Sequence, residues 1–324
     1  MPAHHRSPHP MPKKNRTDWL DRLADRAFRG LIWLMHRLPW RTRIRTMGWL
    51  FANVVGPAAG YSRRAHENLR MIFPDMSADE RRRVVRASLD NVGRTIIENY
   101  SPEDQLRDVA VLQPRGPGWP AIEAARRAKQ PIIFVSAHFG NWQAARAALN
   151  QRGYDIGGLY RPFNNPYANA HYVESIERVG GRAYARSRHG IAAFLRTLRS
   201  GGQAAMMLDQ YVAQGALLDF LGQPAPTSLS AAEMALKHDA LLVPIYGLRL
   251  KDGFGFEMRI EAPIPHSDPQ AMTQALNDSL AAMIRAAPNQ WFWMHRRWKP
   301  HRVAARLARE AAEIEAEPES TTKG

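Results

Sequence analysis

The sequence predicts an α/β protein built on a mixed central sheet with helices on both faces. Three observations favour this class. Short apolar runs such as 131–137 and 241–250 have the length of buried strands. Segments of helical periodicity separate these runs, and glycine pairs at 180–181 and 201–202 end two of the segments. Strands that alternate with helices in this way are typical of a sheet covered by helices on both sides.

The chain begins with a basic arm followed by amphipathic sequence. Residues 1–16 are rich in His, Pro, Lys and Arg, and we expect them to be disordered. Residues 17–62 alternate apolar and basic blocks, and the apolar blocks 31–35 and 49–55 are shorter than the ~20 residues of a membrane-spanning helix. We interpret this region as helices that lie in the surface of an anionic membrane. Core-packing helices with solvated arginines explain the same pattern, and the two interpretations are compatible.

Helices are predicted next, before strands and helices begin to alternate. Residues 61–99 are expected to be helical, with Ser77 as an N-cap and Glu80 at the capping-box position. After a loop rich in Pro and Gly, the predicted helices are 121–129, 141–151, 166–179, 190–200, 230–238 and 268–286, and the predicted strands are 131–137, 154–160, 203–208, 241–250 and 254–261. Residues 63–301 therefore form the predicted main domain, and 302–324 a charged tail.

Charge and composition narrow the class of partner. The 324 residues carry a formal net charge of +15 and include no cysteine, which excludes disulfides, thiolate metal sites and a cysteine nucleophile. Such a basic chain attracts polyanions: nucleic acid, anionic lipid or an acidic carrier protein. No zinc-ligand spacing or RNA-recognition motif accompanies the charge, whereas nine tryptophans do. The combination favours a membrane surface over nucleic acid.

The first candidate for chemistry is a histidine at the end of a predicted strand. His138 directly follows the run 131–137 and precedes the small-residue turn Gly140-Asn141. A neutral imidazole there is suited to act as a general base on a hydroxyl group. The N–H groups of the turn, at the start of a helix, are candidates for holding an anion or a developing oxyanion. Because a lone histidine is often structural, the motif by itself leaves both roles open.

Two further polar sites follow predicted strands. Arg161 precedes Pro162, which favours an extended backbone, and an arginine there either binds a phosphate or is an ordinary surface residue. Asp209-Gln210 offers a carboxylate that can assist His138, bind a sugar hydroxyl or stabilise a loop. Ligands of such sheets bind at the carboxyl ends of strands, so these residues are candidates for one site with His138.

An aromatic and basic segment closes the main domain. Residues 291–299 read Trp-Phe-Trp-Met-His-Arg-Arg-Trp-Lys. One interpretation is a surface that binds lipid headgroups through Arg296 and Arg297. The other is a C-terminal strand that closes the core with cation–π pairs.

The order and spacing of these motifs resemble the late acyltransferases of lipid A biosynthesis, the bacterial lauroyl and myristoyl transferase family. The similarity spans about residues 18–301, through motifs at 136–142, 160–162, 209–210, 220–227, 242–244 and 288–299. The resemblance implies a glycerolipid-acyltransferase-like fold. It also implies transfer of a fatty acyl group from an acyl-carrier-protein thioester, or from acyl-CoA, to a hydroxyl of a glycolipid such as a lipid A precursor.

The resemblance further implies the roles of site residues and the location of the protein. His138 corresponds to the general base and Arg161 to an arginine associated with the acceptor phosphate, with no metal, no cofactor and no covalent enzyme intermediate. The candidate substrate-binding residues are Gly140, Asn141, Arg161, Gln210, Arg296 and Arg297. The expected location is the cytoplasmic face of the bacterial inner membrane, peripheral or N-terminally anchored. Acyl-carrier protein and anionic lipid are the expected partners, and nucleic acid is not.

One residue departs from the family pattern. The family motif His-x-x-x-x-Asp/Glu supplies a base and the carboxylate that orients it, whereas this chain carries Gln143. An amide oxygen can hold the imidazole tautomer but brings no negative charge to stabilise imidazolium. Three explanations are open: a working pair of His138 and Gln143, substitution by another acid such as Asp209, or a weakened or inactive relative that binds lipid or acyl carrier.

Overall fold

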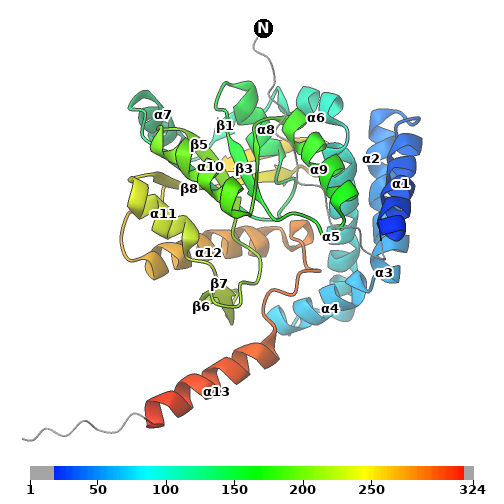
Figure 1. Ribbon diagram of the computed structural model, residues 1–324. Coiled ribbons are helices and arrows are strands. Elements are labelled where there is room, and N and C mark those ends of the chain that lie inside the picture. Colours follow the sequence, from blue (N-terminus) through cyan, green and yellow to red (C-terminus); the bar gives the residue numbers. More distant parts are fainter. Residues whose placement is uncertain (1–17, 317–324) are drawn as a thin grey trace, which may run out of the picture.

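The central sheet has seven strands, and helices cover both of its faces (Figure 1). The computed structural model describes residues 18–316, so the predicted arm 1–16 and the end of the tail lie outside the described residues. The strand order is β1-β9-β8-β2-β5-β3-β4. The strands are β1 Pro114–Arg115, β2 Ile132–Ser136, β3 Gly157–Tyr160, β4 Ala183–Ala185, β5 Gln203–Met207, β8 Leu241–Arg249 and β9 Phe256–Ile260.

Every neighbouring pair in this sheet is parallel except β8 and β9. Those two strands, predicted at 241–250 and 254–261, form a hairpin. A small second sheet pairs β6 Ala216–Phe220 with β7 Gln223–Thr227 in antiparallel fashion. The predicted mixed α/β sheet is therefore confirmed.

Strand β2 shows why the sheet is buried on both faces. Its side chains alternate, so Ile132 and Phe134 join one core while Ile133 and Val135 join the other. The first core is completed by α6 Pro102–Val109, α7 Trp119–Arg127 and α8 Ala144–Gln151, and the second by α10 Arg188–Arg199, α11 Ser230–His238 and α12 Pro269–Ala286. β2 therefore lies between the two cores, and packing on both faces fixes the position of its carboxyl end.

A helical layer precedes the sheet, as predicted, and lies along one side of it (Figure 1). It consists of α1 Asp18–Met35, α2 Trp40–Leu50, a π-helical turn Phe51–Val55, the short α3 Gly56–Ala58, α4 Tyr61–Ile72 and α5 Ala78–Asn99. Ser77 caps α5 by accepting the N–H of Glu80 at 3.2 Å, which confirms the predicted N-cap. Within residues 18–316, no helix is both long and apolar enough to cross a membrane.

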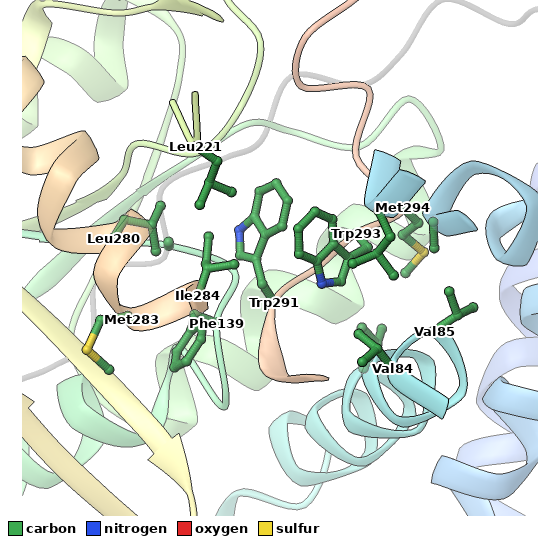
Figure 2. Packing of buried hydrophobic residues seen from close by; sticks show 14 of the residues in the cluster. Val84, Val85, Phe139, Leu221, Leu280, Met283, Ile284, Trp291, Trp293 and Met294 are labelled. Atoms are coloured by element: carbon green, nitrogen blue, oxygen red, sulfur yellow. The ribbon is translucent and has the colours of Figure 1, made fainter. Parts of the chain in front are cut away.

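The segment 291–299 is neither a strand nor a lipid-facing surface. Trp291, Trp293 and Trp298 are buried, and Figure 2 shows the first two between residues of α12 and α5. Arg297 is completely buried, lies over the Phe220 ring at 5.1 Å and donates to the carbonyl oxygen of Pro226 at 2.8 Å. Of the two interpretations, the core-closing one holds in part: the cation–π contact is present, but the segment is not a strand. The indole N–H groups of Trp293 and Trp298 donate to the carbonyls of Pro288 and Phe220. Helix α13, Pro300–Ala316, continues the chain into the tail.

Candidate active site

Strands β2 and β5 bring His138 and Asp209 together. The two strands pair in register up to Ser136 and Met207, and each site residue lies two positions further on. The Nδ1 atom of His138 lies 2.9 Å from Oδ1 of Asp209, and the backbone N–H of His138 donates to Oδ2 at 2.9 Å. One carboxylate therefore fixes both the main chain and the ring of the histidine.

The environment of Asp209 keeps it ionised. Its side chain is completely buried, which alone would raise its pKa, but the facing His138 and its hydrogen bonds hold the pKa of Asp209 well below its usual range. The indole N–H of Trp291 donates to Oδ2 at 3.1 Å and completes the site. Because a carboxylate can only accept, the ring proton of His138 is assigned to Nδ1, which leaves Nε2 as the basic nitrogen.

Aromatic side chains surround the His138 ring. The ring centroids of Trp142, Phe292 and His295 lie 4.9, 5.6 and 4.8 Å from it. Burial, together with the neighbouring His138, lowers the pKa of His295 to about 3, so this second imidazole is neutral at physiological pH. Its Nε2 is buried without a hydrogen-bond partner. These residues were not predicted as part of the site; the available signals were the motif 136–142, which contains Trp142, and the aromatic segment 291–299, which contains Phe292 and His295.

Backbone hydrogen bonds fix the turn after His138 and occupy the N–H groups of Gly140 and Asn141. The N–H of Gly140 donates to the carbonyl of Gln290 at 3.0 Å, and that of Asn141 to the carbonyl of Gly247 at 2.9 Å. The Asn141 amide is buried and donates to Glu98, which forms a buried ion pair with Arg249. Gly140 and Asn141 thus shape the turn, and their predicted substrate-binding roles stay a prediction. The helix predicted from 141 begins later, with α8 at Ala144.

Gln143 faces a different partner from the one expected. Its amide oxygen accepts from Nε of Arg146 at 2.9 Å. Arg146 is buried and donates to the carbonyls of Ile156 and Ile176 as well. Burial lowers the pKa of Arg146 to about 10. The orienting contact to His138 expected of Gln143 is thus made by Asp209, the second of the three explanations offered for the missing carboxylate.

A cavity of about 390 Å³ opens beside His138. β3 pairs with β5 through Gly157 and Gly158, whereas its last residues pair with β4, so the two strands separate toward their carboxyl ends. The cavity lies at this separation, and its wall is mostly apolar, with residues that include Leu149, Ile156, Leu159, Ile176, Phe194, Met206 and Met234. Its volume is within the range of small-molecule sites.

The remaining candidates divide between the cavity and other places. Arg161 and Gln210 are exposed and line the cavity together with His138 and Gln143. Arg296 is exposed but does not line the cavity, and the guanidinium of Arg297 is enclosed in the core. The substrate contacts expected of these two arginines stay predictions.

One group of side chains within residues 18–316 has the composition of a metal site. His138, Asp209 and His295 place one ligand atom each within 4.8 Å of one another. Both oxygens of Asp209 already accept hydrogen bonds, from His138 and from Trp291. The expectation that the reaction needs no metal stays a prediction.

The fold and site define a class of protein in which an imidazole–carboxylate pair lies beside an apolar cavity at the carboxyl edge of a sheet. Within that class, the chain belongs to the bacterial lipid A biosynthesis acyltransferase family, because the sequence model of this family matches residues 11–300. The family membership predicted from the motifs is thereby confirmed, and the protein is a member of a family of acyltransferases.

Individual relatives are distant but cover most of the chain. A lipid A biosynthesis acyltransferase of Haemophilus influenzae is 26% identical over 266 residues, 81% of this chain and 83% of the relative. The lipid A biosynthesis lauroyltransferase of Escherichia coli is 25% identical over 281 residues, 83% of this chain and 89% of the relative. A phosphatidylinositol mannoside acyltransferase of Mycobacterium tuberculosis is 24% identical over 181 residues, 55% of this chain and 57% of the relative.

Proposed function

We propose that the protein is a membrane-associated O-acyltransferase that moves a fatty acyl chain from an acyl-carrier-protein thioester to a hydroxyl of a glycolipid. The observation that carries the proposal is the bonded pair of His138 and Asp209 beside an apolar cavity. The activities named for the relatives support a glycolipid acceptor, because both lipid A and phosphatidylinositol mannoside are glycolipids. A lipid A precursor is the first acceptor to test.

In this reaction Nε2 of His138 accepts the proton of the acceptor hydroxyl as its oxygen attacks the thioester carbonyl. The C–O bond forms, the tetrahedral intermediate collapses, and the C–S bond breaks. The imidazolium donates this proton to the leaving thiolate, and neutral His138 is regenerated. Asp209 holds the ring, and its carboxylate supplies the negative charge that stabilises the imidazolium and that Gln143 cannot provide. The apolar wall of the cavity accommodates the acyl chain.

The N-terminal helices supply the membrane contact in this proposal. Helix α1 packs on α9, Pro166–Val179, yet exposes a second apolar face with Trp19, Leu23 and Trp33 between 56% and 62% accessible. Arginines flank that face, and such a helix fits the interface of an anionic leaflet. The cytoplasmic face of a bacterial inner membrane is the proposed location.

The experiment that tests the proposal is an acyl-transfer assay. Purified protein is incubated with acyl-carrier-protein thioester, or acyl-CoA, and phospholipid vesicles that contain a lipid A precursor or another glycolipid. We expect acylated glycolipid with the wild type and at least ~100-fold less with His138→Ala. Undiminished transfer by His138→Ala would contradict the mechanism. Lipid profiling of a deletion strain identifies the acceptor through the acyl chain that is missing.

A further inference from the structure

The cavity rim carries two arginines side by side, of which Arg161 was expected and Arg186 was not. Tyr160 of β3 and Ala185 of β4 are paired residues of parallel strands, and the two arginines follow them directly. The N–H of Arg186 donates to the carbonyl of Tyr160 at 2.8 Å, so the backbones remain adjacent beyond the strands. Neighbouring strands lie about 4.8 Å apart. Both arginines are exposed and line the cavity.

The charged side chains that line the cavity are all arginines. In the described part of the chain, neither guanidinium has an ion pair or a side-chain hydrogen bond. Residues 161–200 contain seven arginines against two acids, and one of these acids, Glu177, accepts the N–H of Ala183. Helix α10 starts at Arg188, so its positive end also lies near the pair. Like charges on adjacent strands repel each other, and an anion placed between them removes that cost.

From this arrangement we infer that Arg161 and Arg186 form a clamp for a phosphate group of a substrate whose reacting end lies in the cavity. Two planar guanidiniums offer paired N–H donors that match the oxygens of a phosphate, and a phosphate carries enough charge to neutralise both. The inference rests on the proposed function for the location of the reacting end, and it adds Arg186 as a specificity residue. The phosphate belongs either to the glycolipid headgroup or to the phosphopantetheine arm of the donor.

Direct binding tests the clamp without reference to catalysis. Inorganic phosphate is titrated into the full-length protein at constant ionic strength, and binding is followed by calorimetry and by thermal stabilisation. We expect Arg186→Gln to weaken phosphate binding about 10-fold and Arg186→Lys to weaken it less, because lysine keeps the charge but loses the paired donors. Arg188→Gln is the matched control, since Arg188 is exposed and lies outside the cavity wall. Equal affinities in wild type, Arg186→Gln and Arg188→Gln would overturn the clamp.

Kinetics identify the source of the phosphate. With a phosphorylated glycolipid acceptor, Arg186→Gln is expected to raise the acceptor KM about 10-fold with little change in kcat, and to have no effect once the acceptor is dephosphorylated. A rise in KM for acyl-carrier-protein thioester, absent with acyl-pantetheine, assigns the phosphate to the donor instead and equally supports the clamp. An unchanged KM for both substrates contradicts it. If no acceptor is acylated at all, the proposed function fails while the binding measurement still decides the clamp.

Discussion

In the proposed mechanism, Asp209 rather than Gln143 positions His138 as the base. The carboxylate contacts both the ring and the backbone N–H of the histidine. Asp209→Asn keeps the shape but removes the charge, and its amide can donate to Nδ1 and so select the unproductive tautomer. We expect kcat to fall by about 10²–10⁴-fold, the upper figure being the effect of the same change in a serine protease triad. Single-turnover assays with acyl thioester measure it, and a fall of less than threefold in a folded variant would count against the pair.

Gln143→Glu tests whether catalysis lacks a carboxylate at position 143. A carboxylate at this position meets the buried Arg146, because Gln143 already accepts from its Nε. The new charge-assisted hydrogen bond is expected to raise the free energy of unfolding by about 1 kcal/mol and to leave kcat within a few-fold of the wild type. Denaturant unfolding and the transfer assay measure the two quantities. A large gain of activity from a near-zero background would instead indicate a degenerate site in the natural chain.

Sequence periodicity was sufficient to predict the strands that carry the site, because β2 and β5 are apolar runs of ordinary length. It placed His138, Arg161 and Asp209 at the carboxyl ends of strands, where the structure has them. The register that joins His138 to Asp209 depends on packing between segments 71 residues apart, which no local pattern encodes. Burial of Arg297 and the tryptophans was equally unpredictable, because a solvated and a core-closing segment can share this composition.

The turn between β2 and α8 makes a sharp prediction about Gly140, and Gly30 of helix α1 is the control. Gly140 has a φ of 56°, and a Cβ there would overlap the carbonyl oxygen of Gly247. Gly140→Ala is therefore expected to destabilise the protein by more than about 3 kcal/mol, through backbone strain and overlap together. Gly30 lies on α1 with no atom within 4 Å of a Cβ, so Gly30→Ala is expected to stabilise by up to ~1 kcal/mol. Denaturant unfolding compares the two, and similar stabilities would refute the account of the turn.

For the whole molecule, His295 makes the free energy of unfolding depend on pH. The pKa of His295 is lowered to about 3 by burial, whereas an unfolded histidine titrates near 6.5. Below pH 6.5 His295 binds a proton in the unfolded chain but not in the folded protein. The free energy of unfolding therefore falls as the pH falls. The slope attributable to His295 is roughly 1.4 kcal/mol per pH unit between about 6 and 4. His295→Gln should reduce the slope of unfolding free energy by that amount, and an unchanged slope would show that His295 is protonated in the folded state.

In the proposed function, the net charge of +15 and the exposed face of α1 act together on membrane binding. Charge alone attracts the protein to any anionic surface, but only apolar side chains gain from entering the interface. Trp19→Ser with Trp33→Ser is therefore expected to weaken binding to phosphatidylglycerol vesicles by at least ~10-fold, while Val111→Ser, which changes an exposed apolar residue outside α1, leaves it unchanged. Vesicle sedimentation at low and high salt separates the two contributions, because salt screens the attraction and leaves the apolar contact. If DNA binds with similar salt sensitivity and affinity, and the tryptophan variant matches the wild type on vesicles, the charge serves polyanions in general and α1 is not the membrane face.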